Sequence, residues 1–130
     1  MKIRLVLFLS SILMTASSAY AQNPTERFLN SIDDLMKIES IAFGERSDDE
    51  IIERIKENVR GKLRDPDSAE FRRVTLKREE EAIYACGQVN AKNAYGGYTG
   101  FKWFFATPIS MFHSEQDNTG QIVIAHYCAP

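Results

Sequence analysis

Apolar side chains recur with a helical period in the first part of the chain. In residues 23–41 they stand three or four positions apart, and this spacing predicts an amphipathic helix. The apolar residues are Phe28, Ile32, Leu35, Met36 and Ile41. Asn23 precedes Pro24 and stands three residues before Glu26, which is typical of a helix N-terminus. We interpret the apolar stripe as the face that packs on the protein's own core, and a partner-binding helix is the alternative.

A second helix is predicted from about Asp48 to Gly61. Ser47 stands three residues before Glu50, and this pair forms a capping-box signature. The apolar residues that would form its buried face are Ile51, Ile52, Ile55 and Val59. A short turn is expected at 65–71, where Phe71 would anchor the chain to the core.

From residue 72 onward the pattern changes to the two-residue alternation of strands. We expect strands at 72–78, 82–90, 101–106 and 121–128, and a loop at 108–120. Short connections favour antiparallel pairing. Two helices followed by strands predict one α+β domain over residues 22–130, in which N-terminal helices pack on one face of a three- to four-stranded, mainly antiparallel sheet.

The first 21 residues have the pattern of a signal peptide. Lys2 and Arg4 precede an apolar run at 5–15 that is too short to span a bilayer, and small residues flank Tyr20 before the cleavage point. We therefore expect cleavage after Ala21 and a periplasmic or secreted protein; an uncleaved anchor is the alternative. No cysteine follows the apolar run and no later segment is strongly apolar, so we expect a soluble mature chain without a lipid anchor or a membrane span.

Charge narrows the class of partner. Without the leader, 109 of the 130 residues remain, with 14 of the 16 Lys and Arg and all 18 Asp and Glu. This negative balance argues against a general nucleic-acid binder. Residues 54–78, however, carry nine basic and four acidic side chains. This basic block is either a patch for anionic partners, such as phospholipid headgroups, lipopolysaccharide or an acidic protein, or a solvated surface that balances the acidic first helix. We favour the solvated surface.

Cys86 and Cys128 are the only cysteines. In an exported protein such a pair is expected to be oxidised, so a Cys86–Cys128 disulfide is predicted. With His113 and His126 the cysteines are also zinc-ligand types, but the spacing lacks the close pairs of zinc sites, and we expect no metal or other cofactor. His126 and Cys128 would share one face of the last expected strand, which leaves open a Cys–His nucleophile pair.

Residues 85–105 hold four of the seven glycines and the single tryptophan. The glycines at 96–100 are not followed by the Lys and Ser or Thr of a phosphate-binding loop, and they open no predicted helix. Glycines beside aromatic residues more often serve turn geometry and packing, but they can also form a shallow ligand surface. The candidate binding surface consists of Asn90, Asn93, Tyr95, Gly96, Gly97 and Tyr98.

Three motifs together carry a resemblance. They are Leu63-Arg64-Asp65-Pro66-Asp67-Ser68-Ala69-Glu70-Phe71-Arg72, Cys86-Gly87-Gln88-Val89-Asn90-Ala91-Lys92-Asn93 and Gly96-Gly97-Tyr98-Thr99-Gly100-Phe101. In combination they resemble a pattern in a family of small, uncharacterised exported proteins and lipoproteins of Gram-negative bacteria. The resemblance covers about residues 55–105 and implies a compartment and a shared architecture, but no catalytic residues. Unlike the lipoprotein members, this chain lacks a lipid-attachment cysteine.

No Ser/His/Asp arrangement or pair of carboxylates stands out in the sequence. We therefore predict a non-enzymatic periplasmic or secreted domain with a binding or structural role, whose partner is a protein or an envelope component. Neither the identity of this partner nor the oligomeric state follows from the sequence. One form of this role is an inhibitor or immunity protein against an envelope-acting toxin. The alternative class is a small envelope hydrolase or thiol enzyme that uses His126 with Cys128 or a nearby carboxylate.

Overall fold

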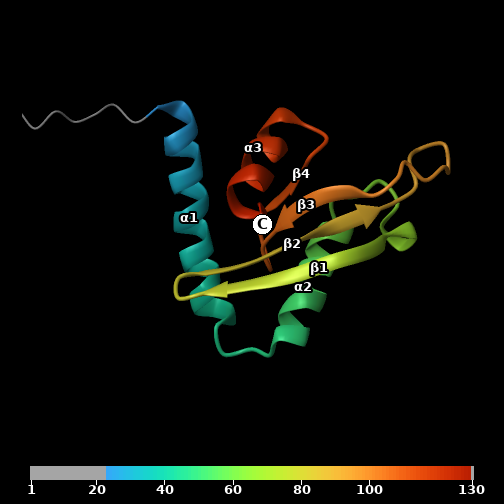
Figure 1. Cartoon of the computed structure of the whole chain (residues 1–130). Coiled ribbons are helices and arrows are strands. Elements are labelled where there is room, and N and C mark those ends of the chain that lie inside the picture. The colour runs from blue at the N-terminus through green and yellow to red at the C-terminus, as the bar shows by residue number, and fades with distance from the viewer. Residues whose placement is uncertain (1–22, 130) are drawn as a thin grey trace, which may run out of the picture.

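The computed structural model describes residues 23–129, so the expected leader lies outside the described residues. The three described helices are arranged around a four-stranded sheet (Figure 1). In chain order the elements are α1 (Pro24–Phe43), α2 (Asp48–Arg60), a short helical turn η1 (Pro66–Ser68), β1 (Glu70–Glu79), β2 (Ala82–Asn90), β3 (Lys102–Ala106), β4 (Phe112–Ser114) and α3 (Asn118–Tyr127). None of the described helices is both long and apolar enough to cross a membrane.

Both N-terminal helices begin at the capping boxes that the sequence predicts. The Asn23 side chain accepts a hydrogen bond from the backbone N–H of Glu26 at 2.8 Å, and the Glu26 carboxylate accepts one from the backbone N–H of Asn23 at 3.2 Å. Ser47 and Glu50 form the same reciprocal pair at the start of α2. These bonds satisfy backbone N–H groups that the first turn of a helix leaves without a partner.

The four strands form an antiparallel sheet in the order β1-β2-β3-β4. Each strand pairs with its neighbour in sequence, so β2 and β3 are central. The α+β class with an antiparallel sheet is therefore confirmed. A bulge interrupts β1 between Arg72 and Thr75, where Arg73 has a φ of 53°.

The helices cover both faces of the sheet, and the prediction that they cover one face is wrong. On one face, α2 packs in a cluster made of Ile51, Ile55, Val59, Ile83, Ala85, Val89, Phe104 and Ala106. On the other face, α1 and α3 pack in a cluster made of Ile32, Met36, Tyr84, Cys86, Phe105, Met111 and Val123. Side chains alternate across a strand, so the buried residues of β2 divide between the two clusters. An apolar central strand needs cover on both sides, and the three helices supply it.

Helix α1 buries part of the predicted stripe: Ile32 and Met36 are buried, and Phe28 packs against the cluster beneath the helix. Its buried residues are Ile32, Met36 and Glu39. Leu35 and Ile41, which the predicted stripe included, are 43% and 85% exposed. The helix crosses one side of the sheet and turns a narrow face toward it, so only positions spaced by three or four residues along that face are covered.

The predicted last strand at 121–128 is wrong, because this segment forms helix α3. The Asp117 side chain caps the helix by accepting a hydrogen bond from the backbone N–H of Gly120 at 2.7 Å. Only Gly120 and Val123 are buried in α3, and they lie one helical turn apart. A short apolar run does not distinguish a helix from a strand by periodicity. The Asp117 cap and the close packing of Gly120 on Ser114 favour the helix here.

The fourth strand lies inside the predicted loop at 108–120. It is β4, which pairs with β3 so that His113 stands opposite Phe105. The turn before β4 is closed by a hydrogen bond from the backbone N–H of Thr107 to the Met111 carbonyl at 3.0 Å. Because β4 has only three residues, its alternation is too short to give a recognisable pattern.

Cys86 and Cys128 form the predicted disulfide, with a Cα–Cα distance of 5.6 Å. Cys86 lies on the central strand β2 and Cys128 caps the end of α3. The bond therefore fastens the last helix to the middle of the sheet. The prediction that His126 and Cys128 share one face of a strand is wrong, since His126 lies in α3 and Cys128 caps the end of this helix. Both sulfurs are bonded, so the described chain has no free thiol.

Candidate functional site

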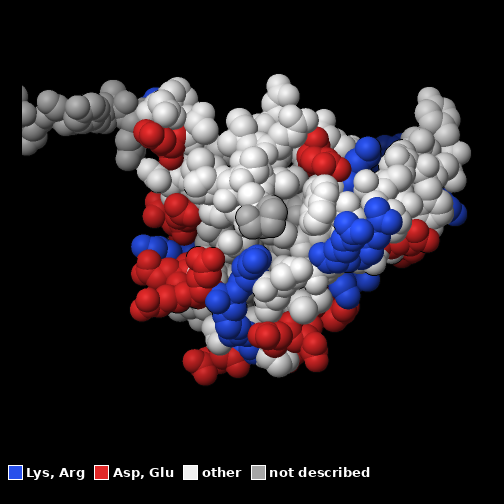
Figure 2. All heavy atoms as spheres, in the orientation of Figure 1, with Lys and Arg blue, Asp and Glu red and all other residues white. Residues whose placement is uncertain are grey.

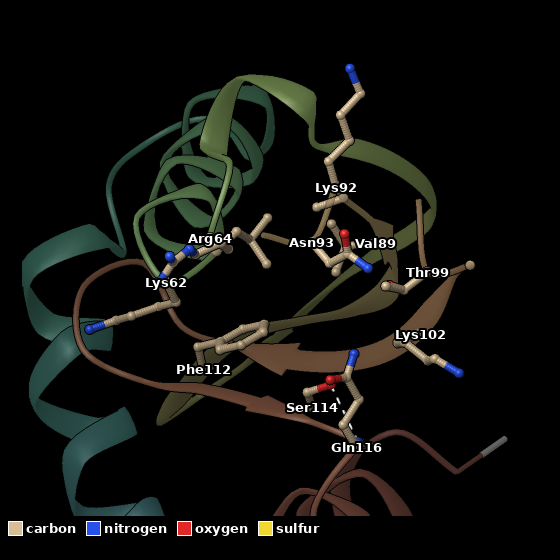
Figure 3. Close-up of a pocket in the computed structure, with 13 residues that line it drawn as sticks. Lys62, Arg64, Val89, Lys92, Asn93, Thr99, Lys102, Phe112, Ser114 and Gln116 are labelled. Atoms are coloured by element: carbon tan, nitrogen blue, oxygen red, sulfur yellow. Dashed lines mark hydrogen bonds between the residues drawn. The ribbon is translucent and has the colours of Figure 1, made fainter. Parts of the chain in front are cut away.

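A pocket with a basic rim lies on the α2 side of the sheet, and we call it the basic pocket (Figure 3). Its cavity volume is about 280 Å³. Its basic residues are Lys62, Arg64, Lys92 and Lys102. None of the 13 described residues that line it is acidic. Four cations without a neighbouring carboxylate in the lining create a positive potential that attracts anions.

The end of α2 places two of these cations. Gly61 ends the helix, and the chain continues in a tight turn in which the backbone N–H of Leu63 donates to the Arg60 carbonyl at 3.0 Å. Leu63 is half-buried and packs on the cluster beneath α2. Because Leu63 points inward, Lys62 and Arg64 on either side of it remain exposed at the pocket.

The other two cations stand at the two ends of the loop between β2 and β3. Lys102 lies opposite Val89 in the register of these strands, so it projects from the α2 face. Lys92 forms an isolated bridge with Tyr98, and its ammonium nitrogen lies 5.6 Å from the centre of the Tyr98 ring. This distance fits a cation–π contact. Antiparallel pairing brings both ends of the loop to the same end of the sheet.

Uncharged polar groups and an apolar floor complete the basic pocket. Figure 3 shows the Asn93 amide above the level of the Phe112 ring and the Gln116 amide beside the ring, while the lysine ammonium groups point outward and away from one another. The Asn93 side-chain oxygen accepts hydrogen bonds from the backbone N–H groups of Tyr95 and Gly97 at 2.9 and 3.2 Å. This leaves its NH₂ group to donate at the pocket. Lysine side chains are flexible, so the ammonium groups can turn inward onto a ligand.

Ion pairing elsewhere does not neutralise the basic pocket. The ion pairs formed among residues 23–129 use Lys37, Arg54, Lys56 and Arg78. The four cations of the pocket are therefore not paired within the described part of the chain. Arg54 and Lys56 belong to the same basic block as Lys62 and Arg64, but they pair with Glu57 and Glu53 on the exposed side of α2.

The predicted binding surface lies at the loop between β2 and β3, but most of its polar atoms hold the loop itself. Asn90 accepts a hydrogen bond from the backbone N–H of Gly100 at 3.0 Å, which closes the base of the loop. Asn93 caps the turn, and Gly96 takes a positive φ of 78° that favours glycine. Gly97 accepts a hydrogen bond from the backbone N–H of Asn93 at 2.9 Å.

Only Asn93 of the six predicted surface residues lines the basic pocket. Tyr95 is 96% exposed and Tyr98 is 47% exposed, so both remain available at the surface of the loop. The prediction did not include Lys92, Thr99, Lys102, Ser114 or Gln116. Two signals in the sequence could have located the pocket: Lys92 and Lys102 bracket the glycine-rich loop, and Lys62 and Arg64 belong to the basic block.

The residues weighed for zinc do not form a shared site. Cys86 and Cys128 are joined in the disulfide. His113 packs edge-on against Phe28, with ring centres 6.1 Å apart, and burial lowers its pKa below the ordinary value of 6.5 while Asp117 partly opposes the shift. His126 is exposed on α3. Among residues 23–129, no group of three or more His, Cys, Asp or Glu side chains is placed to hold a metal ion.

The chain matches no protein-family model, and no curated protein or solved structure is significantly similar to it.

Proposed function

We propose that this protein is a non-enzymatic binding domain and that its basic pocket holds an anionic group of the ligand. The observation that carries the proposal is the gathering of Lys62, Arg64, Lys92 and Lys102 around one cavity with no acidic residue in its lining. These residues come from three separate parts of the chain. A solvated surface does not require such convergence, and an anion-binding site does.

The chemistry of the basic pocket fits an organic phosphate. Lysine ammonium groups act as mobile point charges, and the Arg64 guanidinium offers a planar fork that matches two phosphate oxygens. The amides of Asn93 and Gln116 add neutral donors to the lining. Phe112 and Val89 form an apolar floor that would accept the group to which the phosphate is attached. Phospholipid headgroups and the phosphates of lipopolysaccharide are members of this class, and an acidic protein is the alternative ligand.

The proposed place of action is the periplasm or the exterior of the cell. The pattern of the first 21 residues supports export, and the disulfide is compatible with an oxidising compartment. N-terminal sequencing of the protein recovered from cell fractions tests this part independently of any ligand. We expect a periplasmic or secreted chain that starts at Gln22. A cytoplasmic chain that keeps its leader would contradict the proposal.

Calorimetric titration with glycerol 3-phosphate and with pyrophosphate tests the binding role. The pocket variant is K62Q/R64Q. The matched control is R54Q/K56Q, which removes the same charge from the same basic block outside the pocket. Because a hydrogen bond to a charged group contributes about 1.5–3 kcal/mol, we expect the pocket variant to bind at least about tenfold more weakly. The control should bind as the wild type does.

Two results would contradict the binding role. One is no heat of binding with either probe, and the other is an equal loss of affinity in both variants, which would indicate general attraction to positive charge. A thiol enzyme is the less favoured alternative, since Cys86 and Cys128 would have to be released from their disulfide before either could act as a nucleophile.

A further inference from the structure

We propose that the protein has a second binding site, for an acidic sugar of the uronic acid type, on the opposite face of the sheet from the basic pocket. The site consists of Arg72, Gln88, Phe101 and Trp103, and we call it the arginine platform. It shares no residue with the basic pocket and does not depend on the function proposed for that pocket.

Strand register assembles the arginine platform. Arg72 on β1 stands opposite Gln88 on β2, and Gln88 stands opposite Trp103 on β3. Directly opposed residues project from the same face, and neighbouring strands are about 4.8 Å apart, so the row spans about 10 Å. This face also holds Cys86 and Phe105, which α1 and α3 cover.

The arginine platform lies beyond the cover of α1 and α3, toward the end of β2. Arg72 is exposed, Phe101 and Trp103 are half-buried, and Gln88 is buried. Figure 2 shows the corresponding face, with basic side chains gathered over the part of β1 and β2 that lies near the β2 arrowhead in Figure 1. Acidic side chains dominate the opposite side of the view, around α1.

Two contacts hold the Arg72 guanidinium in a fixed orientation. Its Nε donates a hydrogen bond to Gln88 Oε1 at 2.8 Å, and its Cζ lies 3.8 Å from the centre of the Phe101 ring. The ion pairs formed among residues 23–129 do not include Arg72. Its terminal nitrogens are thus left as a planar fork, and this geometry matches the two oxygens of a carboxylate. Because the side chain is already ordered, binding loses little further conformational entropy.

Trp103 supplies a surface for the ring that bears the carboxylate. Together with Ile124 and Cys128 it borders an open hollow of about 420 Å³ beside α3. A flat aromatic surface with a polar edge suits the C–H face of a sugar ring. Gln88 is buried, and its role is to hold the Arg72 guanidinium in place. An extended peptide would instead seek unpaired backbone at a sheet edge. The row from Arg72 to Trp103 runs across the strands rather than along the edge of β1, so we favour the sugar.

Tryptophan fluorescence reports this site directly, because Trp103 is the only tryptophan in the chain. The purified protein is titrated with sodium glucuronate, with glucose as the same ring without the carboxylate, and with acetate as the carboxylate without the ring. We expect a saturable change of emission with glucuronate. Glucose lacks the carboxylate that Arg72 would bind, and acetate lacks the ring that Trp103 would contact. Each should therefore bind at least about tenfold more weakly than glucuronate.

The variants R72Q and R72K separate the fork from simple charge. R72Q removes the charge, whereas R72K keeps the charge but removes the planar fork, and both should weaken glucuronate binding about tenfold. The matched control is K77Q, which lies on the same strand and face, opposite Tyr84. It should bind as the wild type does, and so should K62Q/R64Q in the basic pocket. Circular dichroism checks that each variant is folded, and R72K replaces R72Q if the latter is not.

Three kinds of result would overturn the arginine platform. The first is no change of emission at millimolar glucuronate. The second is equal binding of glucuronate and glucose, or equal binding by the wild type and R72K. The third is stronger competition by a short peptide with a free C-terminal carboxylate, which would make the site a peptide site.

Discussion

The Glu39 carboxylate accepts a hydrogen bond from the Thr107 hydroxyl at 3.0 Å, across 68 residues of sequence, and both residues are buried. The same carboxylate accepts hydrogen bonds from the backbone N–H groups of Ile109 and Ser110 at 3.0 and 3.1 Å, and from the Ser110 hydroxyl. Glu39 therefore ties α1 to the chain between β3 and β4. This loop leads directly into β4, which carries Phe112 and Ser114 of the basic pocket.

Replacement of Glu39 by alanine should destabilise the protein strongly. The change leaves the buried Thr107 hydroxyl and three partly buried donors at Ile109 and Ser110 without their acceptor. A buried donor without a partner costs about 1–3 kcal/mol and the partly buried donors can bond to water, so we expect a total loss of roughly 2–4 kcal/mol. Urea unfolding measures the difference. The control is I38A on the same helix, where the side chain is 65% exposed. A loss of less than about 0.5 kcal/mol in E39A, the usual range for surface changes, would contradict a structural role.

The disulfide should contribute a large share of the stability. Cys86 and Cys128 are 42 positions apart in sequence. Closing a loop of this length lowers the entropy of the unfolded chain, and the chain-entropy model gives about 4 kcal/mol. C86A/C128A should lose most of this stability in urea unfolding, and a reducing agent should affect the wild type but not the variant. Two titratable thiols in the folded wild type would contradict the bond.

Gly120 marks the closest approach of α3 to the sheet. A Cβ atom at this position would overlap the backbone carbonyl of Ser114. G120A therefore requires α3 to shift away from β4, and overpacking of this kind costs about 1–3 kcal/mol or more. The control is G61A, where a Cβ would meet only ordinary contacts of 3.5 and 3.6 Å. Equal thermal midpoints for G120A and the wild type would show that α3 packs differently.

His113 should make the protein less stable as the solution becomes acidic. Burial lowers its pKa in the folded state below 6.5, so the unfolded chain takes up a proton first as the pH falls. The contribution of neutral His113 to the free energy of unfolding is therefore complete above pH 6.5. It is lost as the pH falls from 6.5 toward the lowered pKa of the folded state. The pKa values of Glu50 and Glu53 are lowered from 4.5, mainly by hydrogen bonds with Ser47 and Lys56, so these carboxyls titrate below the range of pH 5 to 8 in which His113 is tested.

Urea unfolding of the wild type and of H113Q between pH 8 and pH 5 tests the assignment. The wild type should lose stability relative to H113Q as the pH falls through this range. If the two curves stay parallel, His113 is not the titrating group.

The sequence predicts local features of the fold more reliably than features set by distant contacts. The capping boxes at Asn23 and Ser47 mark the starts of two helices correctly, because both partners of each box lie within four residues. The strand at 82–90 follows from its own alternation. The disulfide follows from cysteine count and the inferred compartment. Each of these depends on nearby residues or on a general chemical rule.

The features that the sequence does not predict depend on tertiary contacts. A charged helix residue such as Glu39 is normally expected at the surface, and only the contact with the loop at Thr107 buries it. The apolar run at 121–128 is compatible with a helix and with a strand. The helix is favoured by the packing of Gly120 on Ser114 and by the cap at Asp117. The basic pocket unites residues 62–64 with residues 92–102 and 114–116, and antiparallel pairing, rather than any local motif, brings these segments together.

The central claim is that the basic pocket binds a phosphate-bearing ligand, and an NMR titration with pyrophosphate tests it most directly. We predict that backbone cross-peaks of Lys92, Asn93, Thr99, Lys102 and Gln116 shift in a saturable way, while cross-peaks of α1 stay in place. The K62Q/R64Q variant should reduce these shifts, and the R54Q/K56Q variant should not. The absence of shifts, or shifts spread over basic residues throughout the chain, would contradict the claim.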